Sequence, residues 1–254
     1  MISVAAVEEF TFQFSDKDAN GQSQLRQLEG VEAILISPRW ADHGFNPLTQ
    51  STQVLQQQRR AAFSGITIQE FKKLRIPDSV MREGILFVWT EKELMYEIIQ
   101  HFESMGFYYV ENLCYVMLDP SQVKSTKEIN TTDATSAIAR EDYMFITKAH
   151  RTLLMLRRTQ ATGQKGSAPT AALELRHQRT EDVVFDFIDK NQPFKKPDYF
   201  VYKLIETLLP KAMNYLHMGA SKEQFEKGRK IKMVELWAQD DTPRKGWLKV
   251  RSLR

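Results

Sequence analysis

The chain has 254 residues, of which 42% are hydrophobic and 26% are charged, and its formal net charge is +3. This composition excludes wholesale disorder and predicts a domain with a sizeable core. The mild positive charge is compatible with a nucleic-acid partner and does not require one. A single cysteine, Cys114, excludes an internal disulfide and a cysteine-rich zinc site. Its apolar surroundings predict a buried thiol in a reducing compartment.

No apolar run reaches the roughly 18 residues that a membrane span needs, so no membrane association is expected. The first residues include Glu8 and Glu9 and lack the basic start and long apolar stretch of a secretory signal. Residues 1–30 are mixed and polar, which predicts a loosely attached lead-in with a loop at Ser15–Ser23. Residues 31–254 show no domain break and no internal repeat, so a single domain is predicted there.

The first apolar run, Glu32–Ser37 (EAILIS), predicts a buried strand that Pro38 closes. Gln50–Ala62 is rich in Gln and Arg and predicts a surface loop or an exposed helix. Thr67–Leu74 predicts a short amphipathic helix, which Ile76-Pro77-Asp78 ends. The apolar side of this helix is formed by Ile68, Phe71 and Leu74.

The clearest unit in the sequence is a strand, a helix and a second strand joined by short connections. The strands are predicted at Gly84–Thr90 and Phe107–Leu118, and the helix at Glu91–Gly106. Thr90 is the expected N-cap, and Gly106 is expected just beyond the last turn. The apolar stripe of the helix consists of Leu94, Met95, Ile98, Ile99, Phe102 and Met105. Such a unit predicts a parallel sheet.

The second half of the chain continues as strands and helices separated by polar loops. Further strands are predicted at His150–Leu156, Ala171–His177, Lys232–Ala238 and Trp247–Leu253. Further helices are predicted at Thr180–Asn191 and from Pro197 to about Leu209, where Pro210 ends the second. Loops are predicted at Asp119–Arg140 and Thr159–Pro169. The pattern as a whole predicts an α/β domain.

Several common site motifs are absent from the sequence. There is no G-x-G-x-x-G fingerprint, no G-x-x-x-x-G-K-[ST] loop, no H-E-x-x-H helix and no G-x-S-x-G elbow. The histidines are His43, His101, His150, His177 and His217. Because they lack metal-ligand spacing, we expect surface or packing roles for all of them and predict no metal site.

Three stretches, taken in order, carry a family resemblance. They are Glu32–Trp40 (EAILISPRW), Gly84–Met117 (GILFVWTEKELMYEIIQHFESMGFYYVENLCYVM) and Pro197–Gln239, in which PDYFVYKLIE precedes VELWA. Together they resemble the adenine-N6 methyltransferase family, which includes the catalytic and non-catalytic subunits of the mRNA m6A writer and of the ciliate DNA 6mA writer. The likeness covers roughly residues 30–250. It implies a Rossmann-like methyltransferase fold with a mostly parallel central sheet flanked by helices.

The resemblance also implies that the family's chemistry has been lost. Where the family carries Asp-Pro-Pro-Trp, this chain has Ser37, Pro38, Arg39 and Trp40. In the family, the Asp and a Pro carbonyl orient the adenine amino group for attack on the methyl group of S-adenosylmethionine. Ser37 is a weaker acceptor than a carboxylate, and Arg39 adds a cation where a sulfonium would lie. Without the resemblance, these residues fit an ordinary turn at the end of a strand.

The cofactor half of the family pattern is altered as well. After Glu-Leu-Phe-Gly, active relatives carry Arg, then His-Asn, and later Asn-Trp. Here Glu235 and Trp247 remain, Gln239 stands at the Arg position, Gly246 precedes the Trp, and the His-Asn pair is missing. The resemblance therefore implies vestigial cofactor residues Glu235, Gln239 and Trp247, no catalytic residue, and no S-adenosylmethionine bound by this chain.

The implied function is that of a non-catalytic subunit in a nuclear adenine-N6 methyltransferase complex, with DNA 6mA as the product. The expected partner is a catalytic paralogue that holds S-adenosylmethionine, together with further DNA-binding accessory subunits. Loops after Trp40 and Leu118 are expected to face the paralogue. The alternative is an active or RNA-directed adenine-N6 methyltransferase with an altered motif, in which Ser37 accepts a hydrogen bond and Glu235 holds a ribose.

Nucleic-acid binding is predicted separately, from clusters of basic residues. The candidates are Arg157, Arg158, Arg229, Lys230, Lys232, Arg244, Lys245, Lys249 and Arg251. If these side chains contact phosphates, binding weakens steeply as salt is raised. An ordinary solvated surface is the alternative interpretation of each cluster.

Overall fold

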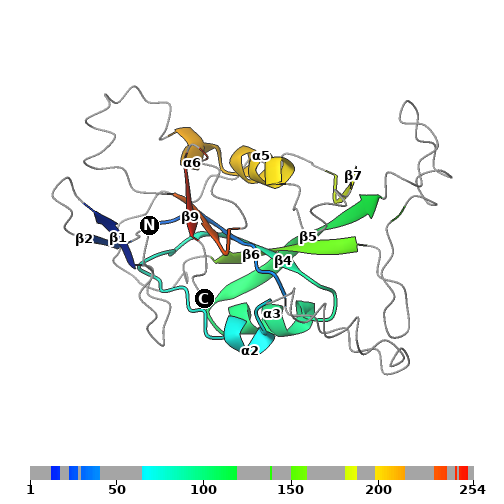
Figure 1. Cartoon of the computed structure of the whole chain (residues 1–254), viewed down its shortest axis with the longest axis horizontal. Coiled ribbons are helices and arrows are strands. Elements are labelled where there is room, and N and C mark those ends of the chain that lie inside the picture. Colours follow the sequence, from blue (N-terminus) through cyan, green and yellow to red (C-terminus); the bar gives the residue numbers. More distant parts are fainter. Residues whose placement is uncertain are drawn as a thin grey trace, which may run out of the picture.

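The computed structural model of the chain describes residues 13–17, 23–27, 30–40, 65–118, 138, 150–158, 181–187, 198–214, 232–238, 244 and 246–250. A seven-stranded sheet is covered by helices on both faces, and a separate two-stranded sheet precedes it in the chain (Figure 1). Among the described residues, no helix is long and apolar enough to cross a bilayer.

Several sequence predictions lie outside the described residues. The predicted segments concerned are 50–62, most of 119–140, 159–169 and 171–177. The candidate site residues concerned are Arg229, Lys230, Gln239, Lys245 and Arg251. These assignments therefore stay predictions.

The large sheet is mixed but mostly parallel. Its strands, in order across the sheet, are β7 (Val183–Phe187), β5 (Phe107–Leu118), β6 (His150–Arg158), β4 (Gly84–Thr90), β3 (Ala33–Ile36), β8 (Met233–Leu236) and β9 (Trp247–Val250). Strand β6 runs antiparallel to both of its neighbours, and every other pairing is parallel. The predicted α/β class with a mostly parallel sheet is confirmed. The predicted β4–helix–β5 unit is present, with β6 inserted between its two strands.

The core lies on both faces of the sheet because strand side chains alternate in direction. Ile34 and Ile36 pack on the face covered by helices α2 (Ile68–Phe71) and α3 (Met95–Glu103). Ala33 and Leu35 pack on the face covered by α5 (Asp198–Leu208) and α6 (Pro210–Asn214) (Figure 1). A strand that is buried on both faces needs a continuous apolar run. This requirement accounts for the sequence of β3 and for that of β4, in which every residue is buried.

Of the two helices on the first face, α2 begins with a side-chain cap and α3 does not. Thr67 caps α2, since its hydroxyl accepts the amide of Glu70 and the Glu70 carboxylate accepts the amide of Thr67. Thr90 does not cap α3, contrary to prediction, because it still pairs with Thr152 in the sheet. Helix α3 begins only at Met95, after a turn. Beyond its end, Gly106 has a φ of +80°, as expected for a residue that follows the last turn.

Three other predictions are corrected. Residues 183–187 form strand β7 and not a helix, because the β-branched and aromatic sequence VVFDF suits an extended chain and pairs in parallel with β5. The predicted loop at Ser15–Ser23 overlaps strands β1 (Gln13–Lys17) and β2 (Ser23–Gln27), which pair antiparallel. Cys114 is half-buried and not fully buried, since it lies in β5 next to edge strand β7.

Arg158 is a buried cation that ties loops to the sheet. Its side chain is 6% exposed, and its guanidinium donates to the carbonyls of Met81, Ile76 and Met105 at 2.7, 3.1 and 2.5 Å. It also stacks 4.0 Å from the Phe107 ring centre. Burial lowers the pKa of the guanidinium, and the exposed Asp78 carboxylate at 2.9 Å opposes this shift. Arg158 is thus a structural residue and not the solvated phosphate contact predicted from the sequence.

We expect Arg158→Met to lower the free energy of unfolding by about 3 kcal/mol, because several buried carbonyls lose their donor. Urea unfolding measures the change as a shift of midpoint at unchanged slope. The matched control is Arg82→Met, at an exposed position, where a change within about 0.5 kcal/mol is expected. Equal small losses for both variants would contradict the structural role of Arg158.

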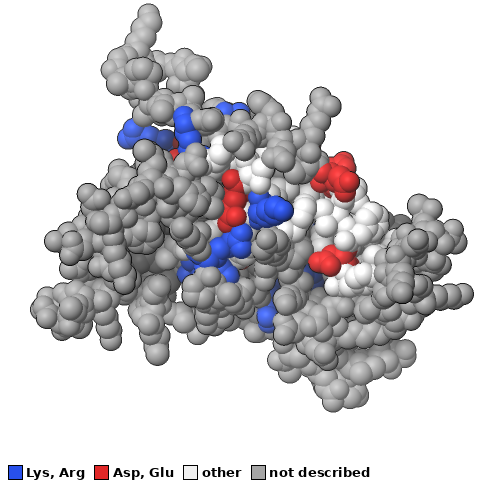
Figure 2. Space-filling view, turned by 90° about the horizontal axis from the view of Figure 1, so that it is seen from above, with Lys and Arg blue, Asp and Glu red and all other residues white. Residues whose placement is uncertain are grey.

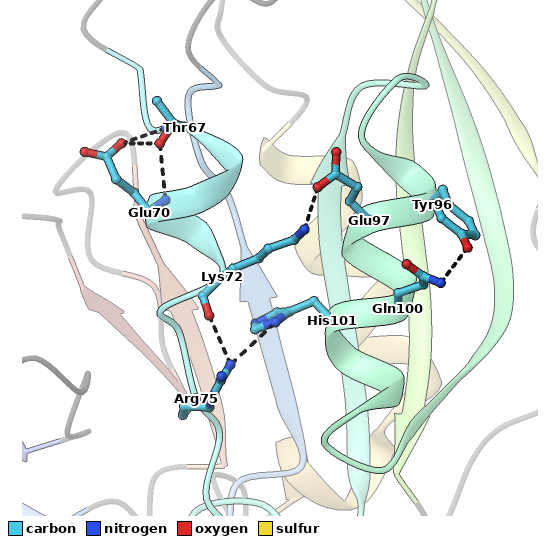
Figure 3. Close-up of polar contacts among 8 residues, drawn as sticks. All are labelled: Thr67, Glu70, Lys72, Arg75, Tyr96, Glu97, Gln100 and His101. Atoms are coloured by element: carbon cyan, nitrogen blue, oxygen red, sulfur yellow. Dashed lines mark hydrogen bonds and ion pairs between the residues drawn. The ribbon is translucent and has the colours of Figure 1, made fainter.

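Polar contacts join α2 and its following turn to α3 (Figure 3). The Lys72 ammonium lies 2.5 Å from the Glu97 carboxylate. The ring of His101 bridges two groups, with Nε2 3.0 Å from the Leu74 carbonyl and Nδ1 3.5 Å from the Arg75 guanidinium. Because Arg75 can only donate, His101 is the neutral tautomer whose Nε2–H donates to Leu74. Burial, with Arg75 and Lys72 nearby, lowers the pKa of His101, and the Leu74 bond opposes this shift.

The lowered pKa predicts a pH dependence of stability. Below about pH 6.5, the unfolded chain takes up a proton at His101 more readily than the folded chain. The histidine therefore costs stability progressively as the pH falls from there through the folded pKa. We expect the wild type to lose more stability than His101→Gln between neutral pH and about pH 5, measured by urea unfolding at each pH. Parallel pH curves for the two proteins would count against this role.

Candidate functional site

The strand order creates a switch point between β3 and β8. The chain leaves β3 for β4 on one side, whereas it leaves β8 for β9 on the other. Strands β3 and β8 are parallel neighbours, with Ile36 opposite Leu236, and the Ser37 amide donates to the Leu236 carbonyl at 2.9 Å. In open α/β sheets, ligands bind outside the carboxyl ends of the strands at such a point. This end of β3 and β8 is therefore the candidate site.

The four residues that follow β3 differ in their exposure. Ser37 and Pro38 are buried, Arg39 is exposed, and Trp40 is half-buried. The Trp40 indole donates to the carbonyl of Trp89 at 3.0 Å, which ties the segment to the carboxyl end of β4. Ser37 therefore lies inside the core, whereas Arg39 lies at the surface.

The residue that follows β8 has an unusual backbone. Trp237 has a φ of 54°, and it is the one non-glycine residue of the described chain with a positive φ. A left-handed conformation is costly for a bulky residue, so it must be held by its surroundings. The indole, 8% exposed, stacks on the Phe71 ring with centroids 5.8 Å apart and planes at 29°.

Phe71 links the two halves of the site. Its ring is fully buried. Besides stacking with Trp237, the ring contacts Trp40, with the two ring centroids 4.9 Å apart. Side chains from α2 and from the residues that follow β3 and β8 thus pack against one another at the switch point.

Glu235 points to the face of the sheet that α5 covers. It lies opposite Leu35 in the ladder, on the face that α5 covers, and is 2% exposed. Its carboxylate accepts a hydrogen bond from the hydroxyl of Tyr202 on α5. The carboxylate that the resemblance assigns to the cofactor is therefore engaged within the core.

Trp247 and Arg244 belong to a polar cluster centred on Glu206 of α5. The Arg244 guanidinium donates to both carboxylate oxygens at 2.6 and 2.8 Å, and the Trp247 indole donates at 2.9 Å. Tyr202 lies between them, with its ring 4.9 Å from Trp247 and 4.7 Å from the Arg244 guanidinium. Since Trp247 lies opposite Met233, this cluster sits at the amino end of the sheet strands, away from the switch point.

The described basic candidates do not form one patch beside the motif. Arg157 and Arg158 lie at the amino end of β4, opposite Ile85 and Gly84. Lys232 lies at the amino end of β3, where its carbonyl accepts the amides of Glu32 and Ala33. Lys232 is 3.1 Å from the Glu32 carboxylate, and Lys249 lies 5.1 Å from the Tyr202 ring centre. Seen from the α5 side, the described basic groups lie close to acidic ones (Figure 2).

Sequence reasoning missed Phe71, Tyr202 and Glu206 as site-forming residues. Tyr202 and Glu206 are four residues apart on a predicted helix, so their common face was visible in the sequence. Their partners come from β8 and β9, which no local pattern reveals. Within the described chain, no group of three potential ligand residues is placed to hold a metal ion.

No protein-family model matches the chain, and no curated protein matches it either.

The positive φ of Trp237 predicts an unusual order of stability for two variants. Trp237→Ala and Trp237→Gly both lose the stacked indole, at a cost of about 3–5 kcal/mol. Only glycine adopts this backbone without strain, so Trp237→Gly is expected to be more stable than Trp237→Ala by about 1 kcal/mol. Urea or thermal unfolding measures the order. A more stable alanine variant would contradict a left-handed backbone at residue 237.

Proposed function

We propose that this chain is a non-catalytic, methyltransferase-like subunit of an adenine-N6 methyltransferase complex that acts on DNA in the nucleus. In this proposal its fold is a Rossmann-like methyltransferase fold, and a catalytic paralogue is its partner. One observation carries the proposal. The segment that resembles the substrate motif and the strand that resembles the cofactor motif come from opposite ends of the chain and meet at the switch point.

The inactivity in this proposal rests on the geometry of that meeting point. A reacting adenine needs an acceptor that it can reach, whereas Ser37 is fully buried. At the end of β8, where a cofactor would lie, the Trp237 indole stacks on the buried Phe71 ring. The carboxylate of Glu235 is bound by Tyr202. We therefore assign S-adenosylmethionine to the partner subunit and none to this chain.

A role in nucleic-acid binding accompanies the proposal. Arg39 is exposed at the carboxyl end of β3, and Arg157 is partly exposed at the amino end of β4. Both are placed to contribute phosphate contacts that orient a nucleic acid without reading its sequence. Arg158 is not part of this surface, because its guanidinium is bound to main-chain carbonyls.

The test combines a cofactor titration with a methylation assay. S-adenosylmethionine is titrated into the isolated chain by calorimetry, and we expect no heat and no thermal stabilisation at millimolar ligand. The chain is then mixed with an adenine-N6 methyltransferase paralogue from the same cell. We expect the two to co-elute and methylation of adenine-containing DNA to rise, with a smaller rise on RNA of the same sequence.

Ser37→Ala provides the matched control, since it removes the hydroxyl at the motif position with little change in volume. A non-catalytic subunit keeps its stimulation of the paralogue with this change. Micromolar cofactor binding, or methylation by the isolated chain that Ser37→Ala abolishes, would establish the active-enzyme alternative instead. Failure to bind any such paralogue would refute the partner role.

A further inference from the structure

Strand β7 forms one edge of the large sheet and leaves its outer side unpaired among the described strands (Figure 1). It pairs in parallel with the second half of β5, from Cys114 to Leu118. The Cys114 amide donates to the Asp182 carbonyl, so residue 182 faces β5. Because main-chain groups alternate along a parallel strand, the groups of Val183 and Phe185 point outward. They form a ready template for another strand.

The side chains of this edge are both apolar and exposed. Phe185 is 56% exposed and Phe187 is 41% exposed, and both lie on the same face because they are two residues apart. Their neighbour Asp186 points to the opposite face, where it accepts a hydrogen bond from the buried Tyr115 at 3.1 Å. The rings of Phe185 and Phe187 are thus exposed on one face of β7, while Asp186 between them is bonded to Tyr115 on the other face.

All the charged side chains of the edge are acidic. Glu181 and Asp182 are exposed and precede the strand, Asp186 lies within it, and residues 181–187 contain no Lys or Arg. Within the described part of the chain, neither Glu181 nor Asp182 forms an ion pair. Red acidic atoms stand among white ones at this end of the molecule (Figure 2). An acidic edge repels nucleic acid, and it repels a second copy of itself.

We propose that residues 181–187, the β7 edge, dock an extended segment of a partner protein in which apolar and basic side chains alternate. The segment adds to the sheet as a further strand beside β7. Main-chain hydrogen bonds to Val183 and Phe185 hold it, Phe185 and Phe187 contact its apolar side chains, and the carboxylates select Lys or Arg. This inference goes beyond the proposed function and does not depend on it, since it concerns no methyl transfer.

The test uses a fluorescein-labelled octapeptide of alternating valine and lysine, titrated into the full chain by anisotropy. We expect saturable binding that weakens with salt. An octapeptide with glutamate in place of lysine, and one with proline in place of alternate valines, are expected not to bind. Proline lacks the amide that strand pairing requires. Hydrogen exchange at Val183 and Phe185 is expected to slow when the valine–lysine peptide is bound.

Two double variants separate the contributions of the edge. Phe185→Ser with Phe187→Ser, and Glu181→Lys with Asp182→Lys, are each expected to weaken peptide binding about tenfold. Tyr108→Ser is the matched control, because Tyr108 is 61% exposed at the amino end of β5, whereas β7 pairs only with Cys114–Leu118. It is expected to leave binding unchanged.

Three results would overturn the proposal. Equal binding of the proline-containing peptide would show that no strand is added. Unchanged binding in the phenylalanine variant, with no slowing of exchange at Val183, would place the peptide elsewhere. A dimer of the chain, or a complex with a DNA oligonucleotide, that the phenylalanine variant abolishes would assign the edge to a different occupant.

Discussion

The central position of β3 constrains the rest of the structure. Its two edges pair with β4 and β8, so its peptide groups are satisfied by main-chain hydrogen bonds. Its two faces are covered by helices, so each of its four residues is buried. Ser37 follows the strand, and its amide donates to the carbonyl of Leu236 at the end of β8. The strand order places the switch point between these two strands.

At the switch point, the chain has packing where many α/β proteins have a ligand. Phe71 contacts both Trp40 and Trp237, so one ring from α2 joins the ends of β3 and β8. Trp237 keeps its left-handed backbone where its indole stacks on Phe71, and such a backbone is costly for a bulky residue. In the proposed subunit role, the chain acts through its surfaces and not through this crevice. This is the physical basis on which the proposed subunit role and the docking role of the β7 edge are compatible.

Charged side chains inside the fold have partners. Arg158 is held by main-chain carbonyls under α2 and α3, while Glu235 and Glu206 are held by residues of α5, β9 and the turn before it. Burying a charge without such partners is costly. The acidic residues of the β7 edge differ from these, because they are exposed beside exposed phenylalanine rings. That contrast separates the interior charges, which stabilise the fold, from the surface charges, which are available to a partner.

The sequence by itself determined the elements whose local pattern is strong. The apolar runs of β3, β4 and β5, the stripes of α3 and α5 and the turn at Gly106 were predictable because burial and backbone preference act within a few residues. Tertiary structure alone decided the insertion of β6, the pairing of β7 with β5 and the meeting of Ser37 with Leu236. It also separated Arg157 from Arg158, which are neighbours in the sequence but point to opposite faces of one strand. These features depend on which strands pair across the chain, and a local pattern reports that a segment is buried without specifying what lies beside it.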